Sequence, residues 1–253
     1  MAEWWEDLFT SEAWQEVQRN WSAVEDTVDQ AERVIEALGL EEGARVLDVP
    51  AGDGRIGLEL GAAGFEVVGV DLIEAFVEAG RTDAVRRRIE NVTLEVGDMR
   101  ELGYEDEFDA AICFWGSFGY FDEAGNLEQA RAVAKALKPG GRYLIDTPAL
   151  ETLYPRFRER TWFQVGETIV LQETKLVMGS SRVETEWIFV RGGVAAESHL
   201  TSMRVYSVHE LTGLLRDAGF SSFELRDDEL FDFEIGSQRL WVIASMGDDG
   251  EDM

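Results

Sequence analysis

The residues with the clearest chemical potential form a glycine-containing loop at positions 46–57, VLDVPAGDGRIG. Gly52, Gly54 and Gly57 fit the pattern G-x-G-x-x-G, which opens many dinucleotide-binding sites. A loop between a parallel strand and its following helix presents backbone N–H groups and the positive end of the helix dipole to a ligand. In a dinucleotide-binding protein these groups face a pyrophosphate. The loop therefore predicts a nucleotide-like ligand, and a nicotinamide dinucleotide is the first one to consider.

Two carboxylates near the loop bear on the choice of ligand. Asp48 lies just before the loop, two residues ahead of Pro50, and a carboxylate is unfavourable beside a pyrophosphate. A ligand with a local positive charge suits that position better. Asp71 closes the next predicted strand and can accept hydrogen bonds from ribose hydroxyls in either kind of ligand. Asp48 therefore argues against a dinucleotide, whereas Asp71 does not distinguish the two ligands.

Further candidate binding residues follow the third and fourth predicted strands. The segment EVGDMREL places Asp98 and Met99 at the carboxyl edge of the sheet. There a carboxylate can accept from an adenine amino group, and a thioether can pack on the ring. The segment FWGSFGYF, residues 114–121, adds aromatic faces at the same edge. In an open α/β sheet this edge is the expected ligand crevice.

Five other side chains are candidates for contact with a substrate. Ser117 and Tyr120 follow the fourth strand, where neighbouring glycines also suit a simple tight turn. His199 is a candidate general base, although most lone histidines are structural. Arg204 and Tyr206 stand before a predicted helix, where a structural contact is the alternative. Because no Cys/His cluster has metal-ligand spacing, we expect no metal.

Apolar runs that alternate with helical patterns must position these residues. Strands are predicted at 45–49, 66–70, 92–96, 108–114 and 141–146, and helices at about 54–63, 73–80 and 126–137. An earlier helix is predicted to end at about Leu38, with Gly39 as its stop. This alternation predicts a doubly wound, mostly parallel α/β sheet with helices on both faces.

The alternation breaks after Asp146. Residues 162–206 show period-two patterning interrupted by glycines, which predicts about three antiparallel strands joined by hairpins. Ser207 and Glu210 then match a capping box at the start of a helix. Closing strands are predicted at 222–225 and 238–245. The expected organisation is N-terminal helices and a cofactor-binding core at 1–150, an inserted β-rich lid at 151–206, a C-terminal helix with closing strands at 207–247, and an acidic tail at 248–253.

Taken in order, these motifs resemble those of class I S-adenosylmethionine-dependent methyltransferases. VLDVPAGDGR matches the first motif of that family, with Pro50 where a glycine usually stands, and VVGVD matches the second. GDM matches the third, FDAAICFWGSFGYF the fourth, and ALKPGG the turn before the fifth strand. Each motif is weak alone, and the resemblance depends on their order and spacing across residues 27–150 and, more loosely, 207–245. It implies a Rossmann-like, seven-stranded sheet.

The resemblance also implies a role for each matched residue. The first-motif loop would lie under the methionine part of S-adenosylmethionine, Asp71 would bind the ribose, and Leu72 would lie beside the adenine. An N-terminal helix would cover the cofactor, with Trp21 nearest; core packing on a helix face shared with Trp14 is the alternative. The expected cofactor-binding residues are Asp48, Ala51, Gly52, Asp53, Gly54, Asp71, Leu72, Asp98, Met99, Phe114, Trp115, Gly116 and Trp21.

The function that the resemblance implies is methyl transfer from S-adenosylmethionine to a small-molecule amine or hydroxyl. The family members most similar to this pattern carry a β-rich insertion after the fifth strand, and they include enzymes that act on amino acids and nucleotide-linked sugars. In-line positioning of donor and acceptor can supply most of the catalysis, with a general base needed only for a protonated acceptor. An NAD-dependent oxidoreductase and a non-catalytic module that binds S-adenosylmethionine stay open as alternatives.

Charge and composition narrow the choice of partners. The chain has 51 acidic and 23 basic residues, only three of them lysines, for a net charge of −28. Because this charge repels nucleic acid and anionic lipid, we expect neither as a partner. Acid-rich, lysine-poor surfaces resemble those of proteins from salt-loving organisms, and an ordinary acidic protein is the alternative. With one cysteine, no signal-peptide pattern and no long apolar run, a cytoplasmic location is expected.

Overall fold

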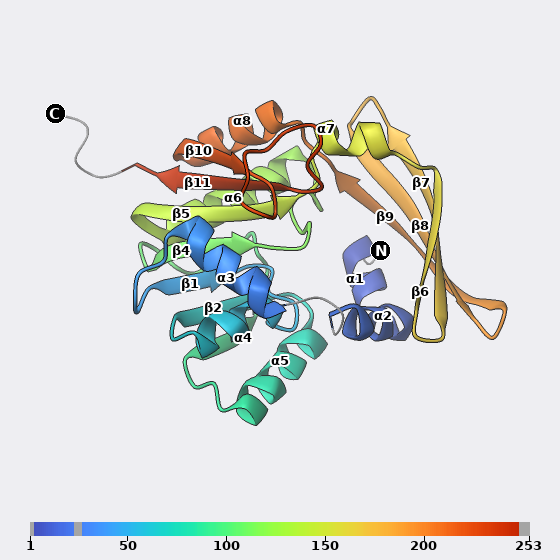
Figure 1. Cartoon of the computed structure of the whole chain (residues 1–253), viewed down its shortest axis with the longest axis horizontal. Helices are drawn as coiled ribbons and strands as arrows, with labels where there is room; N and C mark the ends of the chain where they lie inside the picture. The colour runs from blue at the N-terminus through green and yellow to red at the C-terminus, as the bar shows by residue number, and fades with distance from the viewer. Residues whose placement is uncertain (1–2, 23–26, 248–253) are drawn as a thin grey trace.

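The computed structural model describes residues 3–22 and 27–247 of the chain, which form two sheets and the helices around them (Figure 1). The first sheet contains β1 (Arg45–Asp48), β2 (Glu66–Asp71), β3 (Val92–Val96), β4 (Phe108–Cys113), β5 (Leu137–Thr147), β10 (Phe220–Arg226) and β11 (Leu240–Met246). The second contains β6 (Arg160–Val165), β7 (Thr168–Val177), β8 (Arg182–Arg191) and β9 (Val194–Arg204). The helices are α1 (Trp4–Phe9), α2 (Glu12–Ser22), α3 (Thr27–Leu38), α4 (Arg55–Ala62), α5 (Glu74–Arg87), α6 (Glu123–Ala136), α7 (Leu150–Leu153) and α8 (Val208–Ala218), with a 3₁₀ turn at Tyr154–Arg156.

The first sheet has the order β10-β11-β5-β4-β1-β2-β3. Strands β1 to β5 pair in parallel, whereas β11 runs antiparallel to both of its neighbours, β5 and β10. The strand order reverses between β1 and β4, so the carboxyl ends of these strands border a crevice. The predicted doubly wound, mostly parallel seven-stranded sheet is therefore confirmed.

Helices cover both faces of this sheet, as the alternation of patterns predicted. Helices α3 and α4 pack on one face through an apolar core that includes Val34, Ile56 and Leu60. Helices α6 and α8 pack on the other face through Val133 and Leu211. Among the described residues, no helix is both long and apolar enough to span a membrane.

Several predicted element boundaries were wrong. Helix α5 continues to Arg87 rather than ending near residue 80. The sequence did not indicate this extension, because beyond residue 80 only Ala84 is buried and the apolar pattern is weak. Strand β5 begins at Leu137, four residues before its predicted start, because Leu137 already pairs with Phe108 of β4. The helix predicted at 126–137 starts at Glu123, where Asp122 caps its first turn.

The insertion after β5 forms a separate antiparallel sheet of four strands, not about three. Its order is β6-β7-β8-β9, with consecutive strands joined by hairpins at the predicted glycines and at Gly166. Strand β6 escaped prediction because its residues alternate between exposed and half-buried positions, and its largest side chain, Trp162, is 67% exposed. We call β6–β9 the inserted sheet.

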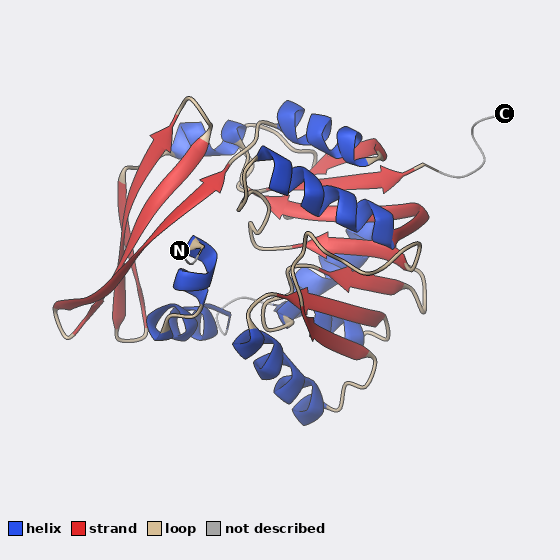
Figure 2. Cartoon of the chain, turned by 180° about the vertical axis from the view of Figure 1, so that it is seen from behind, coloured by secondary structure: helices blue, strands red, loops and turns tan. Residues whose placement is uncertain are grey.

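Helices α1 and α2 lie between the inserted sheet and the seven-stranded sheet, as both views show (Figures 1 and 2). A small apolar core joins them to the inserted sheet, with Leu8, Ala13 and Val17 packed against Val170 of β7 and Phe189 of β8. The N-terminal helices are thus held from both sides. The acidic tail predicted at 248–253 lies outside the described residues.

We expect the stability of this fold to rise with ionic strength. The chain carries 28 more carboxylates than basic side chains, and such an excess of like charges repels itself in the compact state. Raising potassium chloride from about 0.1 M to about 1 M shortens the screening length from roughly 10 Å to roughly 3 Å. The midpoint of thermal unfolding should therefore rise across a chloride series, and further in sulfate, which also strengthens apolar burial. A midpoint that stays flat or falls would contradict the expectation.

Candidate active site

One cavity of about 400 Å³ lies at the carboxyl ends of β1, β2 and β4, beneath α1, α2 and the inserted sheet. Its size falls within the range of small-ligand pockets. The predicted cofactor-binding residues on its wall are Asp48, Ala51, Gly52, Asp53, Asp71, Leu72, Asp98, Met99, Phe114, Trp115 and Gly116. The edge of the sheet therefore brings together all but two of the predicted set. The side chain of Trp21 lies outside the described residues.

The second exception, Gly54, shapes the loop without lining the cavity. Its φ of +75° places it in the left-handed region at the N-cap of α4, a conformation that favours glycine. Gly57 lies in the first turn of α4, where a Cβ would come within 3.0 Å of Asp48 Oδ2. The glycines thus allow α4 to begin directly over the end of β1.

Asp48 is a buried carboxylate under this loop. Only 2% of its surface is exposed, and its Oδ2 accepts a hydrogen bond from the Gly57 N–H at 3.2 Å. Burial raises the pKa of Asp48 to about 7, although the Gly57 bond acts against the increase. Near neutral pH this group therefore changes charge readily. A positively charged ligand in the cavity would favour its ionised form.

The resemblance to S-adenosylmethionine-dependent methyltransferases implies a cofactor with a positively charged sulfonium, and we expect the affinity for it to increase as the pH rises from about 6 to about 8. Below about 7, Asp48 is mostly protonated and attracts a cation less; binding then displaces its proton. Calorimetry in buffers of different ionisation enthalpy should detect this proton release. Asp48→Asn should flatten the dependence, and the neutral thioether S-adenosylhomocysteine should show a smaller one. An equal dissociation constant across the range for the unaltered protein would contradict the expectation.

Asp71 braces the loop from the end of β2. Its Oδ2 accepts from the Gly52 N–H at 2.7 Å, and its Oδ1 accepts from the Ile73 N–H at 2.9 Å. Burial raises the pKa of Asp71, because it is 7% exposed, while these bonds act against the increase. Leu72 beside it is 39% exposed and also lines the cavity. Contact of Asp71 with a ribose and of Leu72 with an adenine stays a prediction.

Asp98 and Met99 extend the wall after β3. Both oxygens of Asp98 accept from the Arg100 guanidinium, at 3.0 Å from Nε and 2.6 Å from Nη2, which lowers the pKa of Asp98. The carboxylate is therefore ionised and fixed in place, with further lone pairs available. Met99 is nearly buried beside it. Their predicted contact with adenine is untested.

The segment after β4 is held by a carboxylate of the neighbouring strand. Asp146 of β5 accepts from the Trp115 N–H at 2.8 Å through Oδ2, and its backbone carbonyl accepts from the Gly116 N–H at 2.9 Å. Trp115 has a φ of +64° and Gly116 one of +74°. These bonds hold a left-handed turn that places Phe114, Trp115 and Gly116 on the cavity wall.

Of the five predicted substrate-contact residues, the structure brings only Ser117 and Tyr120 to the cavity. Both line it, and their hydroxyl oxygens lie 3.4 Å apart. Burial raises the pKa of the Tyr120 phenol well above its usual value, so this group stays protonated.

His199 does not reach the cavity wall, so the structure does not support its prediction as a general base. Its Nδ1 lies 2.7 Å from Asp7 Oδ2 of α1, and its Nε2 lies 3.1 Å from Glu197 Oε2. Burial alone would lower the pKa of His199, but the hydrogen bonds to Asp7 and Glu197 outweigh it and raise that pKa. His199 therefore ties α1 to β9.

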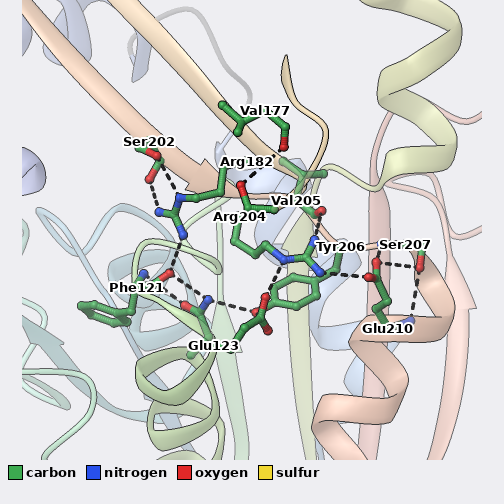
Figure 3. A network of polar contacts seen from close by, with 12 residues as sticks. Phe121, Glu123, Val177, Arg182, Ser202, Arg204, Val205, Tyr206, Ser207 and Glu210 are labelled. Atoms are coloured by element: carbon green, nitrogen blue, oxygen red, sulfur yellow. Dashed lines mark hydrogen bonds and ion pairs between the residues drawn. The ribbon is translucent and has the colours of Figure 1, made fainter. Parts of the chain in front are cut away.

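Arg204 and Tyr206 are likewise absent from the cavity wall, because both belong to a network at the root of the inserted sheet (Figure 3). The Arg204 guanidinium contacts Glu123 at 2.6 Å and Glu210 at 2.9 Å, and lies 4.2 Å from the Tyr206 ring centroid. The Tyr206 hydroxyl contacts Glu123 at 3.0 Å. Arg204 and Tyr206 therefore make structural contacts, which was the alternative to substrate contact.

A second arginine in this network, Arg182, holds the loop that carries Tyr120 (Figure 3). Its Nη1 donates to the Phe121 carbonyl at 2.8 Å and its Nη2 to the Tyr120 carbonyl at 3.2 Å. The Arg204 N–H also donates to the Gly119 carbonyl at 2.8 Å. The start of β8 and the end of β9 thus fix the loop after β4, and with it one side of the cavity.

Sequence reasoning missed most of the cavity's cover. Trp14, for which the sequence indicated core packing on a helix face shared with Trp21, lines the cavity and meets Trp187 of β8 edge-on at 5.2 Å between ring centroids. Trp4, Trp5 and Phe9 of α1 also line it. The signal available was the unusual density of aromatic residues in the acidic N-terminal segment.

This fold and cavity define an α/β protein with a covered crevice at the carboxyl ends of its parallel strands, and comparisons with known proteins show what the chain is similar to. Residues 46–141 match the family model for a methyltransferase domain. The putative methyltransferase YqeM of Bacillus subtilis is 28% identical over 208 residues, which span 79% of this chain and 82% of that one. A demethylmenaquinone methyltransferase of Corynebacterium kroppenstedtii is 29% identical, with 64% and 78% covered.

Among solved structures, the CcbJ methyltransferase of Streptomyces caelestis superposes with a TM-score of 0.77 at 19% identity, covering 87% of this chain and 90% of that one. At that identity the likeness concerns the fold. Residues 46–141 thus form a methyltransferase domain, and the chain has the fold of solved methyltransferases. The buried acids Asp48 and Asp71 on the cavity wall suit a cationic ligand such as S-adenosylmethionine better than a pyrophosphate.

Proposed function

We propose that the protein transfers a methyl group to a nitrogen or oxygen of a small molecule that binds under the inserted sheet. The observation that carries the proposal is one continuous cavity. Its wall joins Asp48 and Asp71, at the strand ends, to Trp187, Thr201 and Met203 of the inserted sheet. The strand ends and the inserted sheet thus border the same cavity, as donor and acceptor positions side by side would require.

When bound, S-adenosylmethionine supplies a methyl group on a cationic sulfur: an acceptor lone pair takes the methyl carbon, the bonding electron pair stays on sulfur, and a proton leaves the acceptor. The chain's part is to hold both molecules in line and to exclude water. We assign the donor side to Asp48, the loop at 51–54, Asp71 and Asp98. The acceptor side belongs to Ser117, Tyr120 and the residues that cover them.

Supporting this division, Arg182 and Arg204 fix the acceptor side to the inserted sheet while the donor side depends on β1 to β3. The demethylmenaquinone methyltransferase relative is named for a small-molecule acceptor, which agrees with the class proposed. The same division assigns residues 151–206 to the acceptor lid. The net charge of −28 argues against a nucleic acid or an anionic membrane as a partner, and we propose a cytoplasmic location.

Two measurements test the proposal. Calorimetry should show binding of S-adenosylmethionine and S-adenosylhomocysteine and none of NAD. Incubation with carbon-13-methyl S-adenosylmethionine and a small-molecule extract of the source cells should then yield a product in which a labelled methyl group has replaced one hydrogen atom. Cofactor binding without any labelled product would favour a non-catalytic binding module, and binding of NAD alone would refute the proposal.

A further inference from the structure

The side of the cavity that covers the acceptor position is built from aromatic rings. We call it the aromatic wall, and it consists of Trp4, Trp5, Phe9, Trp14, Tyr120 and Trp187. Trp4 meets Tyr120 edge-on at 4.9 Å between ring centroids, while Trp5 stacks on Tyr120 at 6.3 Å with 16° between the planes. These rings come from α1, α2, β8 and the loop after β4, so folding assembles the wall from segments far apart in sequence.

Charge is missing from this side. Within the described part of the chain, the cavity-lining residues of α1, α2, β8 and β9 are all uncharged: Trp4, Trp5, Leu8, Phe9, Trp14, Gln18, Trp187, Thr201 and Met203. Several charged side chains of the same elements pair with one another: His199 with Asp7 and Glu197, and Arg191 with Glu16. A buried phosphate would therefore lack a partner on this side, which is costly, and an ammonium group would have only the ring faces as partners.

The two guanidinium groups on the cavity wall belong to other partners. Arg239 forms a two-point ion pair with Asp146, at 2.5 Å and 2.7 Å. Arg55 donates to Gln30 at 2.6 Å and lies over the Trp115 ring. A phosphate-bearing acceptor would have to break these contacts and also enter a chain of net charge −28.

A few polar groups in the wall suit a ligand oxygen. The hydroxyls of Ser117 and Tyr120 form a pair, and Tyr120 stays protonated and can donate. The Tyr120 hydroxyl can thus donate to a carbonyl or hydroxyl oxygen of a ligand.

We infer that the methyl acceptor is an uncharged, planar aromatic compound that carries a hydroxyl or carbonyl oxygen. A planar ring can pack edge-on or stacked against the rings of the aromatic wall, and a hydroxyl or carbonyl oxygen can accept a hydrogen bond from the Tyr120 hydroxyl. This inference rests on the proposed function and narrows it. A nucleotide-linked sugar, which the resemblance to other methyltransferases also allowed, does not fit this wall.

Calorimetry on the protein saturated with S-adenosylhomocysteine tests the inference without turnover. Three probes are compared in about 1 M potassium chloride, which screens the net charge: 1-naphthol, tryptamine and uridine diphosphate glucose. Phenols are neutral at about pH 7. We expect 1-naphthol to bind with a dissociation constant below about 1 mM, tryptamine more weakly, and the nucleotide sugar not at all.

A pair of tryptophan variants provides the matched control. Trp5→Leu should weaken 1-naphthol binding by about threefold to tenfold, the scale of an aromatic pair, and change S-adenosylhomocysteine binding far less. Trp162→Leu, on the exposed face of the inserted sheet, should change neither.

Each outcome decides something. Failure to bind S-adenosylhomocysteine would refute the proposed function itself. If that product binds, then three results would each overturn the inference alone: no saturable binding of 1-naphthol, tighter binding of tryptamine, or binding of the nucleotide sugar. Equal loss of naphthol binding in both tryptophan variants would show that the aromatic wall is not its site.

Discussion

Replacing Gly119 with alanine is expected to lower the free energy of unfolding by about 2–5 kcal/mol. Gly119 has a φ of +107°, a conformation that L side chains rarely adopt. A Cβ there would also collide with the backbone carbonyl of Arg204, which cannot rotate aside as a side chain would. Because the Arg204 N–H donates to the Gly119 carbonyl, relief of the collision would part β9 from the loop after β4.

Urea denaturation at constant salt measures this loss. Gly213→Ala is the matched control, because it lies inside α8 with nothing within 4 Å of its added Cβ. That change should stabilise the protein by up to about 1 kcal/mol, the difference in helix propensity between the two residues. Equal free energies of unfolding for Gly119→Ala and the unaltered protein would show that the contact between β9 and the loop after β4 accommodates the added Cβ without cost.

Asp71→Ala is expected to weaken binding of S-adenosylmethionine by about 10-fold to 150-fold, which corresponds to roughly 1.5–3 kcal/mol for hydrogen bonds to a charged group. The change removes the predicted ribose contact. It also frees the Gly52 and Ile73 N–H groups that the carboxylate now holds, so the loop loses its brace. Calorimetry with both S-adenosylmethionine and S-adenosylhomocysteine measures the effect, which should be similar for the two.

Two further variants separate the loss of the predicted ribose contact from the loss of the loop's support. Asp71→Asn keeps one acceptor oxygen and should lose less affinity than alanine. Glu66→Ala removes an exposed carboxylate at the opposite end of β2 and should leave binding unchanged. An unaltered affinity in Asp71→Ala would show that the carboxylate serves only the loop.

The donor side of the cavity was predictable because its signals are local. Asp48 and Asp71 close short strands and Asp98 follows β3 by two residues, and parallel strands bring their carboxyl ends to one edge whatever the rest of the chain does. The loop glycines likewise act on their immediate neighbours. The pattern of a few residues therefore sufficed for the fold of the core and for most of the donor wall.

The acceptor side was not predictable, because it depends on contacts between distant segments. His199 pairs with Asp7, 192 positions away, and Arg204 with Glu123, 81 positions away. The same residue types would suit a cavity wall equally well without those partners. The aromatic residues of α1 line the cavity although they were not predicted to, because the sequence alone did not show that α1 and Trp187 border the same cavity.

The position of β11 has a consequence for synthesis on the ribosome. It lies between β5 and β10, so β5 keeps an open edge until β11 has emerged, long after β5 itself was made. The inserted sheet pairs only consecutive strands and can form earlier. A growing chain therefore carries the finished cover beside an unfinished core whose exposed strand can pair wrongly. This nascent stage is when the protein would most need a chaperone.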